Sequence, residues 1–230
     1  MEGTLTGKEA SDAIGRLGWR FLLGTLRASV PVMSLASATE VAARAVAACG
    51  DAADQHLLID VRPRRVVLTL QSSDLGAVTT DDVDLAHRIS AAVHEIGLST
   101  EPEIDTGAPR SVQVLEIAID ALDIAAIRPF WRAVFGYADE AGADGPEDPL
   151  VDPVGQGPAI WFQQMELARA RRNRIHFDIC VPHDEAVRRI EAALAAGGRL
   201  LSAARAPAFW VLADREGNEA CVTTWQGRAG

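Results

Sequence analysis

The sequence predicts an α+β protein of two domains. The first domain has the element order α-β-β-α-β-β-α, and the second consists of two successive β-α-β-β-β units. Apolar residues recur at helical spacing in some segments and form short β-branched runs in others. The order of these expected helices and strands differs between the first and the second half of the chain. Between the two patterned regions, residues 99–110 hold two prolines, one glycine and four charged residues without apolar periodicity, which is typical of a linker.

Local signals place the elements of the first domain. Thr6 can cap a first helix that Gly18 ends, and Thr79 followed three residues later by Asp82 is typical of a capping box at the start of the last helix. We expect the helices to lie on one face of the sheet. The expected elements are a helix over 6–17, strands over 19–22 and 28–35, a helix over 37–49, strands over 57–61 and 66–70, and a helix over 79–96.

The second domain repeats one order of elements twice. We place the boundary near Ile104, which predicts domains over 1–104 and 105–230. The two units share an order of elements but have little amino-acid sequence identity to each other. The first unit is expected to hold a strand over 112–119, a helix over 125–135, a loop region over 140–158 and a strand over 159–165. The second is expected to hold a strand over 175–181, a helix over 184–196, and strands near 200, over 209–213 and over 219–225.

Composition and charge exclude several classes of function. The 230 residues are 48% hydrophobic and 23% charged, as in an ordinary globular protein. The formal net charge of −10 disfavours nucleic acid as a partner, because affinity for a phosphate backbone comes from clustered cations. No run of eighteen uncharged apolar residues predicts a membrane helix, and the three widely spaced cysteines fit a reducing compartment. We therefore expect a soluble, cytoplasmic protein with no membrane partner.

The first domain carries motifs that resemble pterin-4a-carbinolamine dehydratase over about residues 5–98. The segment Ala77–Ala86 matches the family's Gly-Leu-(Ser or Thr)-x-x-Asp-x-x-Leu-Ala helix start, with Asp82 at the acidic position. Trp19 falls where the family has its Gly-Trp. The family also has two adjacent histidines followed by proline, and a strand that ends in Thr-His. In this chain these positions hold Gln55, His56, Leu57 and Ser73.

That resemblance implies the loss of water from a pterin hemiaminal, 4a-hydroxytetrahydrobiopterin, with histidines as general acid and base near pH 7. His56 would then be the acid–base residue, Asp82 would support it, and Gln55 and Ser73 would hold the pterin. Glutamine and serine can hydrogen-bond a pterin but cannot exchange protons near neutrality. Because one imidazole of three remains, we expect a degenerate dehydratase site on a retained fold.

Residues 111–227 resemble the vicinal oxygen chelate superfamily, in particular its glyoxalase-like and bleomycin-resistance-like domains. The matching motifs are Pro-Phe-Trp-Arg-Ala-Val-Phe-Gly-Tyr at 129–137, Asn-Arg-Ile-His-Phe-Asp at 173–178, and Asp-Arg-Glu-Gly-Asn-Glu at 214–219. The last motif predicts a turn into the final strand, in which Gly217 adopts a positive φ and the Asp214 side chain hydrogen-bonds the backbone.

Metal-dependent members of that superfamily hold a cation in a cup with four ligands, one from the first and one from the last strand of each unit. By position, Glu116, His176 and Cys221 occupy three of these sites. The fourth falls on Trp161 or Gln163, which share a strand face. Carboxylate with thiolate is a mixed hard and soft set, so a divalent metal is possible but disfavoured. We expect a cup without a metal or other cofactor, in which these five residues bind substrate.

Several aromatic residues lie on the strands expected to line the cup. Trp161, Phe162, Phe209 and Trp210 would give flat apolar walls, and we include Trp210 among the candidate substrate-binding residues. Packing in the core explains these aromatic residues equally well.

Three hypotheses for function follow. The first is a small-molecule enzyme or its remnant that acts on a pterin. The second is a non-catalytic protein that sequesters a hydrophobic or aromatic ligand in the C-terminal cup, as the resistance-protein branch does. The third assigns oligomerisation to the N-terminal domain, because the dehydratase family typically assembles through its sheets and helices. We expect a homo-oligomer with a small-molecule ligand.

Overall fold

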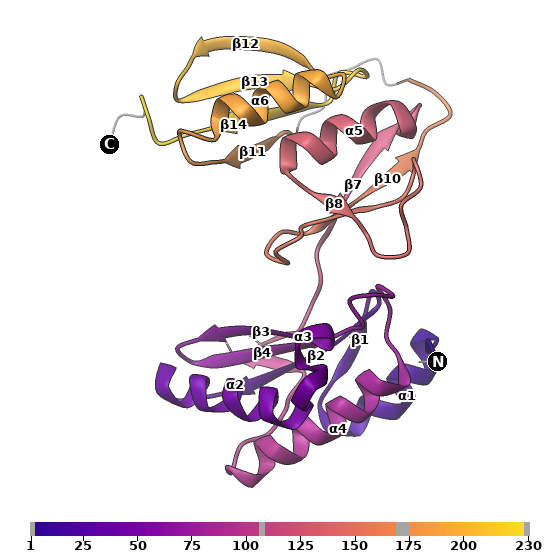
Figure 1. Ribbon diagram of the computed structural model, residues 1–230, viewed down its shortest axis with the longest axis vertical. Coiled ribbons are helices and arrows are strands. Elements are labelled where there is room, and N and C mark those ends of the chain that lie inside the picture. Colours follow the sequence, from indigo (N-terminus) through magenta and orange to yellow (C-terminus); the bar gives the residue numbers. More distant parts are fainter. Residues whose placement is uncertain (1–2, 106–108, 169–174, 228–230) are drawn as a thin grey trace. The chain divides into compact units, whose positions relative to one another are not determined.

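A computed structural model describes residues 3–105, 109–168 and 175–227 (Figure 1). The chain forms two compact units, Met1–Val114 and Leu115–Gly230. Each unit has a hydrophobic core of its own, so the two are described separately. The mixed α+β class and the order of the main elements confirm the sequence prediction.

The first unit is built on a four-stranded antiparallel sheet in the order β1-β2-β4-β3. On the two central strands, Leu26 pairs with Leu70, Ala28 with Leu68 and Val30 with Val66, and all six side chains are fully buried. Such cross-strand apolar pairs stabilise the sheet and set its register. The strands are β1 (Arg20–Leu22), β2 (Thr25–Pro31), β3 (Leu57–Arg62) and β4 (Arg65–Leu70).

Three helices cover one face of this sheet, as predicted (Figure 1). They are α1 (Gly7–Ile14), α2 (Leu35–Cys49) and α4 (Thr80–Glu95). Thr6 caps α1 within a capping box, a 3₁₀ turn over Gly15–Leu17 follows, and Gly18 ends it with φ of +82°. The expected cap and end of the first helix are therefore confirmed.

A four-residue helix, α3 (Ala53–His56), follows a 3₁₀ turn over Gly50–Ala52 and leads directly into β3. The sequence did not predict this helix, because a single turn is too short to show apolar periodicity. Its position matters for the site, because it places His56 at the junction between a helix and the sheet.

The expected linker is partly structured and attached to the first unit. β5 (Glu103–Asp105) and β6 (Pro109–Ser111) pair antiparallel, while residues 106–108 lie outside the described part of the chain. Glu101 exchanges two backbone hydrogen bonds of 2.8 Å with Ser29 of β2. The pairing of β1 with β2 extends only as far as Arg27, so Glu101 satisfies backbone groups that β1 does not reach. This attachment explains why the first compact unit continues beyond the expected boundary at Ile104.

The second unit of the chain contains the predicted pair of β-α-β-β-β repeats. Both have one topology, in which the first strand pairs in parallel with the last and the other pairs are antiparallel. The first sheet has the order β7-β10-β9-β8 and the second β11-β14-β13-β12. The first repeat holds β7 (Glu116–Ala121), α5 (Ile124–Phe135), β8 (Ala138–Asp139), β9 (Leu150–Val151) and β10 (Ala159–Gln164). The second holds β11 (Phe177–Cys180), α6 (Ala186–Ala195), β12 (Arg199–Arg205), β13 (Phe209–Ala213) and β14 (Glu219–Thr223).

The two repeats share one core, in which aromatic residues meet. The rings of Trp131 on α5 and Phe177 on β11 pack edge to face with centroids 5.8 Å apart. The Trp131 Nε1 also donates a 3.0 Å hydrogen bond to Asp214 in the turn before β14. Gly217 in this turn has φ of +94° and Asp214 accepts from the amide of Asn218, as predicted. No helix in the described ranges has both the length and the apolar character needed to cross a membrane.

Candidate functional site

His56 and Asp82 form a buried pair in the first unit. His56 ends α3, and Asp82 lies in the first turn of α4. The imidazole Nδ1 lies 2.9 Å from the carboxylate Oδ1. The exposed fraction is 5% for His56 and 0% for Asp82. The two residues expected to act together in catalysis are therefore in direct contact.

The start of α4 holds the Asp82 carboxylate in place. Its Oδ2 accepts hydrogen bonds from the Thr79 amide at 2.7 Å and from the Thr79 hydroxyl at 2.9 Å, which completes the predicted capping box. One carboxylate oxygen thus caps the helix while the other contacts the imidazole. When Nδ1–H donates to Asp82, the basic lone pair of the ring is placed on Nε2. The pair therefore orients His56 for proton exchange at Nε2.

Backbone hydrogen bonds place Ser73 beside Gln55. The Ser73 amide donates to the Gln55 carbonyl at 2.9 Å, and the Gln71 amide donates to the His56 carbonyl at 3.0 Å. The side chains of Gln55 and Ser73 are exposed, next to the buried His56. The end of α3 and the segment after β4 thus bring the backbones of Gln55, His56 and Ser73 close together. This part of the first unit contains one imidazole and two side chains of types that can hydrogen-bond a ligand.

In the second unit of the chain, Glu116, Trp161 and Gln163 lie on one face of the first sheet. β7 and β10 are parallel, with Glu116 opposite Ala159 and Trp161 opposite Ala118. Because strand side chains alternate, this face is opposite to the one packed against α5. Glu116 also contributes to an acidic group: burial, together with the charges of Glu116 and Asp148, raises the pKa of Glu140 above its usual value.

His176 and Cys221 come together at the second sheet with a residue that the sequence did not predict as a candidate, Asp178. β11 and β14 pair in parallel with Asp178 directly opposite Cys221, and His176 precedes β11. The ligand atoms of these three residues all lie within 4.8 Å of one another. A hollow of about 490 Å³ adjoins them and is also lined by Arg205, Phe209 and Thr223. The alternation of His176 and Asp178 along the chain was the available signal for Asp178.

Trp210 does not share this face. It pairs with Val222 on β14 and packs against the core of the second unit, whereas its neighbour Phe209 lines the hollow. Phe162 likewise belongs to the core and is 6% exposed. For these two residues the structure favours packing over the expected place in the wall of the cup, because alternation along each strand turns them toward the helices.

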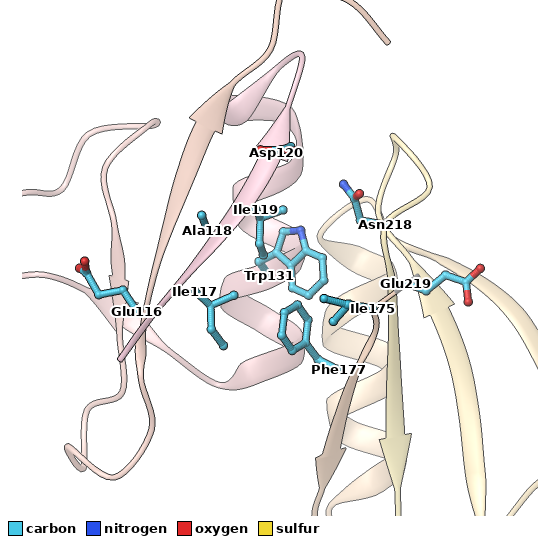
Figure 2. Close-up of a pocket in the computed structure, with 10 residues that line it drawn as sticks. All are labelled: Glu116, Ile117, Ala118, Ile119, Asp120, Trp131, Ile175, Phe177, Asn218 and Glu219. Atoms are coloured by element: carbon cyan, nitrogen blue, oxygen red, sulfur yellow. The ribbon is translucent and has the colours of Figure 1, made fainter. Parts of the chain in front are cut away.

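A larger pocket lies where the two repeats meet (Figure 2). Its volume is about 750 Å³, and it is lined by residues of β7, by Trp131, and by residues around the start of β11 and β14. Figure 2 shows Ile117, Ile119, Ile175 and Phe177 around the Trp131 ring, while Glu219 points away from the pocket. The pocket therefore offers a mainly apolar surface that suits a hydrophobic or aromatic ligand.

The four positions at which the superfamily holds a metal do not supply a matching set of ligands here. Within the described residues, the group of ligand atoms around Cys221 contains His176 and Asp178 but not Glu116. Glu116 lies on the other sheet, and a tryptophan or an amide occupies the fourth position. The residues therefore do not fit the four-ligand cup.

Comparisons with known proteins identify both parts of the chain. Residues 3–92 match the family Pterin 4 alpha carbinolamine dehydratase, and residues 116–223 match the family Glyoxalase-like domain. A protein of Mycobacterium avium strain 104 is 34% identical over 90 residues, which are 39% of this chain and 95% of that protein. A protein of Roseiflexus castenholzii is 33% identical over 94 residues, which are 40% of this chain and 100% of that protein. Both are named "Putative pterin-4-alpha-carbinolamine dehydratase".

The chain belongs to the pterin 4 alpha carbinolamine dehydratase family. Its dehydratase-like domain is joined to a glyoxalase-like domain. Among solved structures, a transcriptional coactivator/pterin dehydratase from Brucella melitensis is 24% identical, covering 39% of this chain and 98% of that one, with a TM-score of 0.36. A glyoxalase/bleomycin resistance protein/dioxygenase family enzyme from Burkholderia phytofirmans is 20% identical, covering 47% of this chain and 95% of that one, with a TM-score of 0.40.

Proposed function

We propose that the dehydratase-like domain removes water from a pterin 4a-carbinolamine with His56 as its one acid–base imidazole, at a lower rate than a site with three histidines. The observation that carries this proposal is the buried contact between His56 and Asp82. A carboxylate on Nδ1 fixes the tautomer and the orientation of the ring, as a general acid or base requires. Gln55 and Ser73, whose backbones are joined by a hydrogen bond next to His56, would hydrogen-bond the pterin.

The reaction needs two proton transfers. The carbinolamine hydroxyl accepts a proton and leaves as water, its C–O bond breaks, and the neighbouring nitrogen loses its proton as the C=N bond forms. His56 can serve one of these transfers at a time through Nε2. Solvent water serves the other, because Gln55 and Ser73 do not titrate near neutrality. The missing imidazoles therefore lower the rate without removing the whole mechanism.

The dehydration rate of the purified full chain tests this proposal. We expect His56→Ala to lower the enzymatic rate about 100-fold, since a positioned acid–base group contributes roughly 10²–10⁴-fold. His87→Ala is the matched control, because His87 is exposed on α4 and should leave the rate unchanged. Gln55→His and Ser73→His should each raise the rate by restoring an imidazole beside His56.

Equal rates for the wild-type protein and His56→Ala would reject the proposal. The dehydratase-like domain would then be a retained fold without this activity. Pterin binding can be followed separately by equilibrium dialysis, so loss of catalysis is distinguished from loss of binding.

We propose a second function for the glyoxalase-like domain, the non-catalytic binding of a hydrophobic or aromatic small molecule. The apolar pocket around Trp131 and Phe177 favours it. Ile175 lines this pocket and is 75% exposed, so its substitution does not disturb the core. We expect Ile175→Ser to weaken the binding of 8-anilinonaphthalene-1-sulfonate, measured by fluorescence titration. Val187→Ser on α6 removes an exposed apolar side chain outside the pocket and should change nothing. Equal weakening by both variants would contradict the proposal.

A further inference from the structure

Helices α5 and α6 of the glyoxalase-like domain contact each other and form a polar groove of about 590 Å³ (Figure 1). The described residues that line it do not include Glu116, His176 or Cys221, so the groove is separate from the predicted cup. It is also separate from the apolar pocket around Trp131. We call it the arginine groove, because its charged and aromatic lining residues are Arg128, Arg132, Tyr137, Glu185, Arg188 and Arg189.

Arg128 on α5 is held rigidly inside the arginine groove. It is 6% exposed. Its Nε donates to the Asp148 carbonyl at 2.7 Å, and its Nη2 donates to the Asp139 carboxylate at 2.8 Å and to the Pro149 carbonyl at 3.2 Å. Nη1 has no hydrogen-bond partner among the described residues. This nitrogen therefore remains available to a ligand in the groove.

Arg132 lies one turn further along α5 and shares the carboxylate of Arg128. Its Nη2 lies 3.2 Å from Asp139, and its side chain is 51% exposed. A guanidinium stays protonated at any physiological pH, so one carboxylate balances only one of these two charges. The α5 side of the arginine groove thus has one fixed and one adaptable cation.

The α6 side repeats this arrangement around Glu185. Arg188 donates two hydrogen bonds to its carboxylate, at 2.9 and 2.8 Å, and Arg189 contacts the same carboxylate at 3.3 Å. Arg189 Nη1 also donates to the Val134 carbonyl at 3.2 Å. A Cβ at Gly136 would lie 2.8 Å from this nitrogen, so the glycine leaves room for the guanidinium at the end of α5. Arg189 is therefore fixed, whereas the side chain of Arg188 is 79% exposed.

Four guanidinium groups thus share two carboxylates, which leaves a local excess of two positive charges. The chain as a whole has a formal net charge of −10, so this excess is confined to the groove and does not reflect composition. The planar fork of a guanidinium matches the oxygens of a phosphoryl group, and a phosphoryl dianion balances two positive charges. The negative charge of the whole chain disfavours a long polyanion such as nucleic acid.

We propose that the arginine groove binds a small phosphorylated molecule. Arg132 and Arg188 close on the phosphoryl group from the two helices, and Nη1 of Arg128 donates to it from inside the groove. The buried Arg128 and Arg189 need little ordering when the ligand binds, which favours affinity. The site lies outside the apolar pocket and outside the dehydratase-like domain, so the inference depends on neither of the proposed functions.

Isothermal titration of the full chain with inorganic pyrophosphate, without a histidine tag and at about 150 mM salt, tests the proposal. We expect one pyrophosphate per chain. Arg132→Gln and Arg188→Gln should each weaken its affinity by about tenfold or more, because each removes a charge-assisted hydrogen bond to the ligand. Both side chains are at least half exposed, so circular dichroism should show folded variants.

Arg215→Gln is the matched control, because Arg215 is an exposed arginine of the same domain that does not line the arginine groove. It removes the same charge and should change the affinity less than about twofold, because exposed charges at a distance are screened by salt. Three outcomes would overturn the proposal: no pyrophosphate binding by the wild-type protein, wild-type affinity in the double variant Arg132→Gln and Arg188→Gln, or equal weakening by Arg215→Gln. The last outcome would show that net charge alone produces the binding.

Discussion

The Asp82 carboxylate performs two structural tasks with its two oxygens. Oδ2 caps α4 through Thr79, and Oδ1 contacts the imidazole of His56. Because the residue is fully buried, removal of its carboxylate leaves polar partners without water to replace it. One side chain therefore couples the stability of α4 to the geometry of the proposed catalytic residue.

We expect Asp82→Ala to lower the free energy of unfolding by about 2–4 kcal/mol, the sum of a lost helix cap and a lost buried hydrogen bond. Asp81→Ala is the control, because Asp81 is exposed in the same first turn and should cost less than about 0.5 kcal/mol. The change in the free energy of unfolding of each variant is measured by urea denaturation, with circular dichroism as the signal. Equal costs for the two variants would contradict the role assigned to Asp82.

Glu140 provides a test of pH dependence. Burial and the charges of Glu116 and Asp148 raise its pKa above the usual 4.5, so the folded state holds the proton more tightly than the unfolded state. The ionised carboxylate therefore destabilises the fold, and this penalty appears as the pH rises from 4.5 through the folded-state pKa. We expect Glu140→Gln to raise the melting temperature at pH 7, and the gain to shrink as the pH falls toward 4.5.

A series of thermal melts from pH 4 to 8 measures this difference. Glu147→Gln serves as the control, because Glu147 is an exposed acid in the same loop region. A gain for Glu140→Gln that stays constant with pH would show that packing, and not ionisation, produces it.

The turn between α1 and β1 shows how one element depends on the conformation of glycine. Gly18 has φ of +82°, and a Cβ there would lie 2.0 Å from the carbonyl oxygen of Thr100. Thr100 itself donates a hydrogen bond to Leu17, so the two segments lie in close contact. Gly15, three residues earlier, has helical φ and ψ and open space around it.

These two glycines should respond to alanine in opposite ways. We expect Gly18→Ala to destabilise the fold by about 2–4 kcal/mol through backbone strain and the collision with Thr100. Gly15→Ala should stabilise it by about 0.4–1 kcal/mol, because alanine restricts the unfolded chain. Thermal melts of both variants check the signs. A neutral Gly18→Ala would contradict the close approach.

Elements with strong local signals could be predicted from the sequence. The expected helix over 79–96 is found as α4, because a capping box and regular apolar spacing act within the segment itself. The expected strand over 66–70 differs from β4 by one residue. By contrast, α3 and the β5–β6 pair are short, and their stability depends on neighbouring parts of the fold.

Residues of the candidate sites were predictable where a motif carried them. His56 and Asp82 were named together from the family resemblance, and their contact depends on a short helix that no pattern indicated. Asp178 was not among the predicted candidates, because its position opposite Cys221 follows from the parallel register of β11 and β14. Trp210 shows the reverse case, since a strand residue can face either side of the sheet and alternation packs it, partly buried, against the core.

At the scale of the whole molecule, the chain combines two independent cores. One core, with the partly buried residues packed against it, consists of residues between Leu5 and Leu98, and the other of residues between Ile117 and Val222. A unit with its own core can fold alone. We therefore expect fragments 1–114 and 115–230 each to unfold cooperatively, and the oligomerisation expected from the dehydratase resemblance to belong to the first fragment.

Strand β3 offers a surface for this association. It is an edge strand of its sheet, and Leu58 on it is 62% exposed. Edge strands with exposed apolar side chains favour pairing with another chain. We expect the full chain and fragment 1–114 to form dimers or tetramers by light scattering, and Leu58→Asp to shift both toward monomers. Leu115 is an exposed leucine of the second unit, so Leu115→Asp should leave the oligomeric state of the full chain unchanged. A monomeric 1–114 fragment that retains its helical circular dichroism would reject an oligomerisation role for the dehydratase-like domain.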